Sequence, residues 1–369
     1  MFSSTFLFCD HLTGERASWL AAVIGAAVGR CPAGNPGRVN IFLTADALFS
    51  LVDARARPAW AALSGLPSVQ VIADADELRL QGLSLPGSTW TPGARVTGTG
   101  DRGSFWGELV STLEREWGGT KTAAFLLCSS PYMSRVPVYM LRFLAQAVEA
   151  GLHPELYCYL DGVHTLHDGQ RPSEFENIGR GVSALAGTAV HSCRDPWFAA
   201  CSRCATARGY YQMNPGTGFC EPASCIQDIA IRNLKEILAR FPDRHPVASH
   251  ASGESVPTEN EKEGAPHLVV FITNPPYGTE WTFGGISLAI AAAAEGIPTR
   301  VVFIEDGVYA LYGTHEVPEN DRIFNIQEMI EATTDIDGLS YFVHAPSLDD
   351  RGIDRKGGFP AARGSRTRN

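Results

Sequence analysis

The feature that most constrains the fold is an internal repeat with matched spacing. Residues Phe125–Leu166 and Val270–Leu311 each begin with an apolar run that leads into a Pro-Tyr pair. In both segments a glycine stands twenty residues after this proline, and an Asp-Gly-Val triplet begins thirty residues after it. Matched spacing at turn residues and strand ends together predicts tandem copies of one structural unit.

The N-terminal part of the chain follows the same plan more loosely. Phe6–Phe8 is expected to form a strand, Ser18–Gly29 a helix and Val39–Leu43 a second strand. This second strand leads into Thr-Ala-Asp-Ala-Leu-Phe, where the other two copies have Asp-Gly-Val. We therefore predict a third, divergent copy at the N-terminus.

The apolar runs AAFLLC, LVVFI and RVVFIE lack the two-residue alternation of a strand with one wet face. Such runs are typical of parallel strands that are buried on both faces. Strand–helix–strand units with right-handed crossovers then predict an α/β fold of three small doubly wound domains, each a mainly parallel sheet flanked by helices. The expected domains are 1–95, 120–243 and 267–355, with linkers 96–119 and 244–266 and a basic tail 356–369.

Composition excludes several classes of function. The formal net charge of -10 argues against nucleic-acid binding, which needs clustered Lys and Arg. Apolar stretches such as Trp19–Val28 are too short to span a bilayer, and the N-terminus lacks the pattern of a signal peptide. Nine cysteines in 369 residues are far below the density of a disulfide scaffold. We expect a cytoplasmic protein without a membrane partner.

Cys201 and Cys204 are the strongest candidates for chemistry. Trp197–Ala200 is expected to form a strand, with Cys201 at its carboxyl end and a helix beginning near Arg203. The carboxyl ends of parallel strands are where such folds bind and react. The start of a helix and the nearby Arg203 and Arg208 favour thiolate over thiol. Because the two cysteines share one helix face, one can attack and the other can resolve.

The other two copies lack these thiols at the equivalent points. The third copy has Tyr341–Gly352, which keeps an Arg-Gly pair but has no cysteine. The first copy has Asp74–Gly82, also without cysteine. The fold is therefore predicted to repeat while the thiols occur in the middle copy alone.

Two later cysteines leave a metal site open as an alternative. Cys201, Cys204, Cys220 and Cys225 together form the spacing Cys-x2-Cys-x15-Cys-x4-Cys, which could hold zinc or an iron–sulfur cluster. The pair could also be two small buried hydrophobes, the commonest fate of a free cysteine. No cofactor is favoured, and nucleotide binding has no support because no phosphate-binding glycine loop follows any strand.

Asp161 and His164 follow the second strand of the middle copy and are expected to lie beside the thiols. Asp161 begins the Asp-Gly-Val triplet, interpreted as a strand-end turn in which the glycine takes a positive φ. His164 is three residues further on and could accept a proton near neutral pH.

The Pro-Tyr turn, the Asp-Gly-Val triplet and the Cys-x-x-Cys-x-x-x-Arg-Gly segment that ends at Gly209 resemble the DsrE/DsrF/DsrH-like family, which includes the TusBCD sulfur-relay subunits. The resemblance implies that an acceptor cysteine near the start of this helix carries a persulfide. Cys201 has the spacing from Arg-Gly of the TusD-like subunits, and Cys204 that of other single-domain members. Which thiol is the acceptor stays open.

The resemblance also implies partners. It predicts an intracellular sulfur-trafficking protein, of sulfurtransferase type, that meets a donor and an acceptor carrier protein. The family's relay subunits form heterohexamers of three related chains, so a homodimer of this fused chain would rebuild a six-domain particle. Nucleic acid would enter only indirectly, through tRNA thiolation. A non-catalytic assembly module is the remaining alternative.

Overall fold

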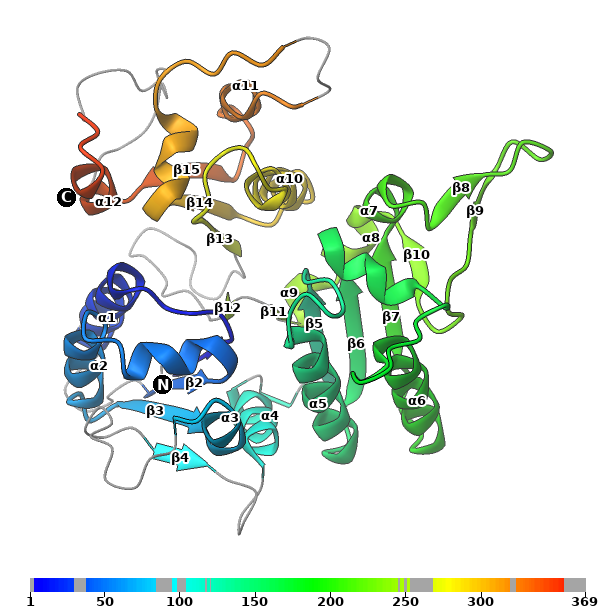
Figure 1. The fold of residues 1–369 in the computed structure, drawn as a ribbon, viewed down its shortest axis with the longest axis horizontal. Coiled ribbons are helices and arrows are strands. Elements are labelled where there is room, and N and C mark those ends of the chain that lie inside the picture. Colours follow the sequence, from blue (N-terminus) through cyan, green and yellow to red (C-terminus); the bar gives the residue numbers. More distant parts are fainter. Residues whose placement is uncertain are drawn as a thin grey trace. The chain divides into compact units, whose positions relative to one another are not determined.

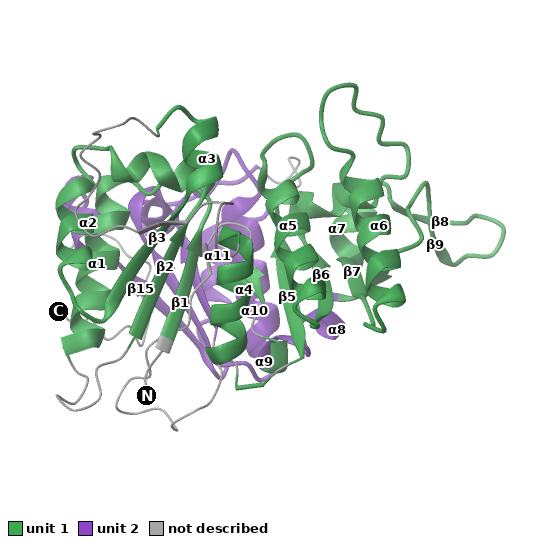
Figure 2. Cartoon of the chain, turned by 90° about the horizontal axis from the view of Figure 1, so that it is seen from below, with its two compact units in different colours: residues 1–233, 243–256 green, residues 234–242, 257–369 purple. Residues whose placement is uncertain are grey.

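The computed structural model describes residues 3–29, 38–83, 95–97, 104–116, 118–119, 121–244, 246–248, 251–252, 268–318 and 323–354. Contacts divide the chain into two compact units, residues 1–233 with 243–256 and residues 234–242 with 257–369 (Figure 2). Within the described ranges, no helix has the length and apolar character needed to cross a membrane.

The first sheet of unit 1 has the strand order β12-β1-β2-β3-β4. Its strands β2, β3 and β4 can be followed in Figure 1. Its strands are β1 (Ser3–Phe8), β2 (Arg38–Leu43), β3 (Val69–Asp74), β4 (Arg95–Thr97) and β12 (Ala251–Ser252). The strands β1 to β4 are parallel and β12 is antiparallel to β1. Its helices are α1 (Gly14–Gly29), η1 (Ala45–Leu51), α2 (Arg57–Ser64) and α3 (Ala75–Leu80). Ile41 and Trp60 are fully buried in the core between sheet and helices.

The segment 96–119, predicted as a linker, contains a packed helix, α4 (Phe105–Glu116). Phe105 and Trp106 are buried in this helix, and the Trp106 ring stacks on Tyr139 with centroids 5.7 Å apart. The interpretation as a linker is wrong here, because apolar side chains at helical spacing bury one face of α4.

The second sheet, also in unit 1, has the order β10-β7-β6-β5-β11 with every pair parallel. Its strands are β5 (Thr122–Leu127), β6 (His153–Cys158), β7 (Trp197–Cys201), β10 (Ala230–Arg232) and β11 (Val247–Ala248). The helices are α5 (Val136–Glu149), η2 (Leu160–Leu166), α6 (Ile178–His191) and α7 (Ser202–Ala207), and a hairpin is formed by β8 (Tyr211–Met213) and β9 (Cys220–Pro222). Helix α5 is followed by its C-cap residue Ala150 and then by Gly151, whose φ of +88° is the left-handed conformation that ends a helix.

The second predicted linker, 244–266, is partly built into these two sheets. Val247 and Ala248 pair with β5, and Ala251 and Ser252 pair with β1. These four residues are strands and not free linker. Residues 253–266 lie outside the described part, as does the predicted basic tail 356–369.

Unit 2 contains a three-stranded parallel sheet, β13-β14-β15. Its elements are α8 (Leu234–Leu238), β13 (Leu268–Ile272), α10 (Trp281–Ala294), β14 (Thr299–Phe303), η3 (Glu305–Leu311), α11 (Ile326–Glu331), β15 (Leu339–Val343) and α12 (Ala345–Asp350). The short helix α9 (Phe241–Arg244) spans the boundary between the two sets of residues. The predicted α/β class, with mainly parallel sheets flanked by helices, is confirmed; the three domain boundaries stay a prediction.

One backbone detail recurs after the second strand of each sheet. Ala45, Leu160 and Glu305 have φ values of +51°, +47° and +53°, and each begins a 3-10 helix. The prediction that the glycine of Asp-Gly-Val takes the positive φ is therefore wrong. Gly162 is needed for another reason, because a Cβ atom there would overlap the carbonyl oxygen of Leu127.

Candidate thiol site

Cys201 and Cys204 lie at the carboxyl edge of the second sheet, as predicted. Strand β7 ends at Cys201, which is the N-cap residue of α7 with an extended backbone, φ -61° and ψ 121°. Both side chains are buried, with 1% and 7% of the residue surface exposed. The pair therefore sits in a dry environment at the end of a parallel strand.

The two thiols form one hydrogen-bonded pair. The Cys204 thiol donates to the Cys201 sulfur, and this contact is the largest cause that lowers the pKa of Cys201, to about 6. The backbone N–H groups of Cys204 and Arg203 and the Arg203 charge act in the same direction, while burial opposes them. Cys201 is therefore a thiolate at neutral pH.

Cys204 shows the opposite shift. Its hydrogen bond to Cys201 and its burial raise the pKa of Cys204 well above the ordinary value, whereas the Leu160 N–H and the Arg208 charge lower it. The pair thus shares a single proton, which stays on Cys204. This asymmetry separates a nucleophile from a proton donor, a distinction that the spacing of the cysteines leaves open.

A third thiol lies on the same edge. Cys128 follows β5, Tyr159 follows β6 and Cys201 ends β7, so the strand register brings these three residues to neighbouring positions. Burial raises the pKa of Tyr159, and the nearby sulfurs of Cys204, Cys201 and Cys128 add to that effect. Cys128 carries no motif in the sequence; its place directly after a strand is the signal that could have found it.

Asp161 and Arg208 link the 3-10 helix η2 to the end of α7. The Arg208 guanidinium donates to Oδ1 of Asp161 from Nε at 3.0 Å and from Nη2 at 2.6 Å. Arg208 is the C-cap residue of α7, and Gly209 follows with φ +78°, the left-handed conformation that ends a helix. The ion pair thereby fixes α7 against the segment that begins at Leu160.

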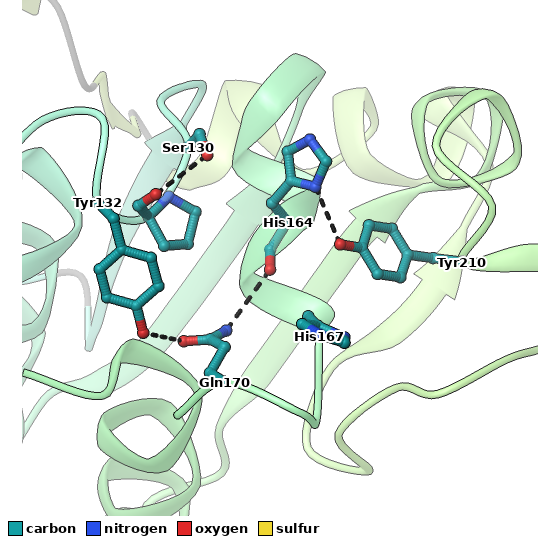
Figure 3. A pocket seen from close by; sticks show the side chains of 7 residues that line it. Ser130, Tyr132, His164, His167, Gln170 and Tyr210 are labelled. Carbon is teal, nitrogen blue, oxygen red and sulfur yellow. Dashed lines mark hydrogen bonds between the residues drawn. The ribbon is translucent and has the colours of Figure 1, made fainter. Parts of the chain in front are cut away.

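His164 lies on the same edge and lines a pocket of about 210 Å3 (Figure 3). The pocket is lined by Ser130, Pro131, Tyr132, His164, His167, Gln170 and Tyr210. Nδ1 of His164 is 2.9 Å from the hydroxyl of Tyr210. Burial lowers the pKa of His164 in spite of the nearby Asp161 carboxylate, so the ring is neutral at pH 7.

The Pro-Tyr turn closes the opposite wall of this pocket. The hydroxyl of Tyr132 donates to Oε1 of Gln170 at 2.8 Å, and the Gln170 amide donates to the backbone oxygen of Thr165 at 3.2 Å. Neither Gln170 nor His167 stood out in the sequence, since both follow the recognisable triplet in a loop without a motif.

The four cysteines of the metal alternative do not converge. Cys220 is exposed on β9, and the thiol of Cys225 donates to the backbone oxygens of Tyr210 and Ala223 at 3.4 and 3.1 Å. Within the described ranges, no three His, Cys, Asp or Glu side chains come together as a metal site. The zinc or iron–sulfur alternative stays a prediction.

The first sheet has carboxylates where the second has thiols. Asp74 caps α3 as Cys201 caps α7, and its Oδ2 accepts a 3.0 Å hydrogen bond from Thr44. Glu77 takes the place of Cys204 and is contacted by α5, with the Tyr139 hydroxyl at 2.8 Å and Arg135 at 3.2 Å. In this copy the position holds neighbouring elements together.

The third sheet has His344 and Ser347 at these positions. Nδ1 of His344 is 2.7 Å from Oγ of Ser347, and this oxygen accepts the N–H of Glu305 at 3.0 Å. Arg351 donates to Asp306 at 2.9 Å, as Arg208 does to Asp161. The Asp–Arg pair thus occurs in both units, and the pair Cys201–Cys204 lies in the second sheet.

A thiolate held by a second thiol, at the carboxyl edge of a parallel sheet, defines a cysteine-based site on an α/β scaffold. Residues 267–361 of the chain match the DsrE/DsrF-like family, which confirms the resemblance for the C-terminal sheet and its helices. The crystal structure of the YchN protein from E. coli is 26% identical over an alignment that covers 26% of this chain and 80% of YchN, with a TM-score of 0.23. No curated protein matches the chain.

Proposed function

We propose that this chain is a sulfur-trafficking protein that carries sulfur as a persulfide on Cys201. The observation that carries the proposal is the buried Cys201–Cys204 pair at the start of α7, in which the hydrogen bond from Cys204 lowers the pKa of Cys201. The DsrE/DsrF-like match at 267–361 supports a role in sulfur relay, because the Asp–Arg ion pair of the matched region recurs beside the thiol pair.

The loading step follows thiol–disulfide chemistry. The Cys201 thiolate attacks the outer sulfur of a donor persulfide, R–S–SH, and the donor leaves as R–S⁻. A new S–S bond joins Cys201 to the transferred sulfur as the donor S–S bond breaks, so no external oxidant is consumed. An acceptor thiolate removes the outer sulfur in the same way and regenerates Cys201.

The partners are proposed from the resemblance to the DsrE/DsrF-like family, and the location from the sequence pattern. We propose a donor and an acceptor carrier protein in the cytoplasm, and a homodimer as the assembled form. Light scattering tests the dimer: the expected mass is twice that of the 39.8 kDa chain, and a monomer at micromolar concentration would count against it.

The persulfide is tested on the Cys204→Ser protein, in which Cys201 is the sole thiol of the pair. After anaerobic treatment with sodium polysulfide, the peptide that contains Cys201 should gain one sulfur atom in the mass spectrum. The exposed Cys193 and Cys220 serve as internal references for unspecific reaction. An unmodified Cys201 beside modified reference thiols would overturn the proposal.

A further inference from the structure

Cys204 lies where a thiol can react with a loaded Cys201. Its sulfur is in hydrogen-bond contact with the Cys201 sulfur, and the two residues begin a helix as Cys-x-x-Cys. This arrangement is typical of cysteine pairs that cycle between dithiol and disulfide. Both thiols are almost completely buried, which limits access of reductants from solution. Cys204 is therefore the thiol best placed to reach the Cys201 sulfur.

Loading would change the state of Cys204. The hydrogen bond to the Cys201 sulfur is the largest cause of the raised pKa of Cys204. When Cys201 carries a second sulfur, the negative charge moves to the outer atom and the inner sulfur becomes a poor acceptor. The Leu160 N–H and the Arg208 charge remain and favour the Cys204 thiolate, while burial still opposes it. Sulfur loading therefore removes the largest of the causes that hold the proton on Cys204, whose sulfur remains next to the inner sulfur of the persulfide.

We propose that the Cys204 thiolate attacks the inner sulfur of the Cys201 persulfide, releases hydrosulfide and leaves a Cys201–Cys204 disulfide. This activity rests on the proposed persulfide. It lets the loaded chain release its sulfur as hydrosulfide when no acceptor is bound.

The step balances without an added reagent. The bond between Cys201 and the outer sulfur breaks as the bond between Cys201 and Cys204 forms. The Cys204 proton passes to the outer sulfur, which is reduced and leaves with the electron pair as HS⁻. The Cys204 sulfur is oxidised, and the Cys201 sulfur keeps the oxidation level that it reached on loading. The class of reaction that must follow is reduction of this disulfide by a dithiol, which restores the pair.

The C-terminal sheet indicates a substitution that the position of Cys204 should tolerate. Ser347 occupies the position of Cys204 and accepts the Glu305 N–H, as Cys204 accepts that of Leu160. Serine therefore fits this buried position, and Cys204→Ser is expected to fold. Cys204→Ala is a second variant that removes the nucleophile without adding a hydroxyl.

The experiment is a single turnover with sodium polysulfide under anaerobic conditions, followed by rapid removal of the reagent. In the wild-type protein we expect the segment 201–204 to be two hydrogen atoms lighter, with one sulfide released per loaded chain. In Cys204→Ser and Cys204→Ala we expect a retained persulfide on Cys201 and no sulfide. Untreated wild-type protein, kept anaerobic, should stay a dithiol.

The two proposals fail separately. If wild-type protein retains the added sulfur and forms no disulfide, the release step is wrong and the carrier role stands. The carrier role itself is wrong if the treated wild type neither gains sulfur nor releases sulfide, and Cys201 takes no sulfur in either Cys204 variant at a pH high enough to ionise its thiol.

Discussion

The thiol of Cys204 donates a hydrogen bond to the sulfur of Cys201, and a single proton serves both residues. Each residue's titration therefore depends on the other. The pKa of Cys201 is lowered and that of Cys204 is raised by the same contact. A substitution at Cys204 is therefore expected to change the pKa of Cys201.

Cys204→Ala should raise the pKa of Cys201 from about 6 toward the ordinary cysteine value of about 8.5, because the strongest donor to the thiolate is lost. Cys204→Ser should leave the pKa of Cys201 between these limits, since its hydroxyl can still donate. The measurement is the thiolate absorbance as a function of pH, with Cys201→Ser as the baseline. Identical titrations of Cys204→Ala and wild type would contradict the assignment.

Because of the thiol pair, the free energy of unfolding should pass through a maximum as the pH rises. Cys201 has a lowered pKa of about 6 and Cys204 a raised pKa, whereas both titrate near about 8.5 in the unfolded chain. Between about 6 and 8.5 the unfolded chain binds more protons than the folded one, so stability rises with pH. Above about 8.5 the folded chain binds more, so stability falls.

The check is urea denaturation of the reduced wild type and of the double variant Cys201→Ser/Cys204→Ser over this pH range. The difference in unfolding free energy between the two should peak near about 8.5. A difference that does not change with pH would show that the thiols titrate as they do in the unfolded chain.

Gly162→Ala should destabilise unit 1 by about 1–3 kcal/mol, because the new Cβ overlaps the Leu127 carbonyl oxygen. The matched control is Gly187→Ala within α6, where nothing lies within 4 Å of the added atom. That change should stabilise by about 0.5–1 kcal/mol. Urea denaturation of both variants measures the two effects, and equal effects would refute the close approach at Gly162.

Glu77→Ala should destabilise unit 1 by about 2 kcal/mol. The change leaves the buried hydroxyl of Tyr139 without its acceptor, while the half-exposed Arg135 regains water. Asp76→Asn is the control on the same helix, since it breaks an exposed pair with Arg79 that should contribute less than about 0.5 kcal/mol. A loss for Asp76→Asn as large as that for Glu77→Ala would argue against a buried anchor.

The carboxyl-edge placement of Cys201, Cys204, Asp161 and His164 could be predicted because parallel strands end at a common edge, and the strand ends were recognisable. The ion pair of Asp161 with Arg208 was not foreseen, although its repetition at Asp306 and Arg351 is a signal in the sequence.

Other features leave less trace in the sequence. The positive φ of Leu160 could not be predicted, because nothing marks a leucine for a conformation that non-glycine residues rarely adopt. Helix α4 was mistaken for a linker because glycine-rich stretches flank its apolar face. In both cases tertiary packing decides the local conformation.

The short strands β11 and β12 lie along the outer strands β5 and β1 of the two sheets of unit 1. The exposed edge of a sheet can recruit strands from other molecules and start aggregation. A chain cut after residue 243 would uncover both edges at once. The stretch that connects the second sheet to the third therefore also keeps these two edges from pairing with other molecules. A soluble fragment of unit 1 has to include this stretch.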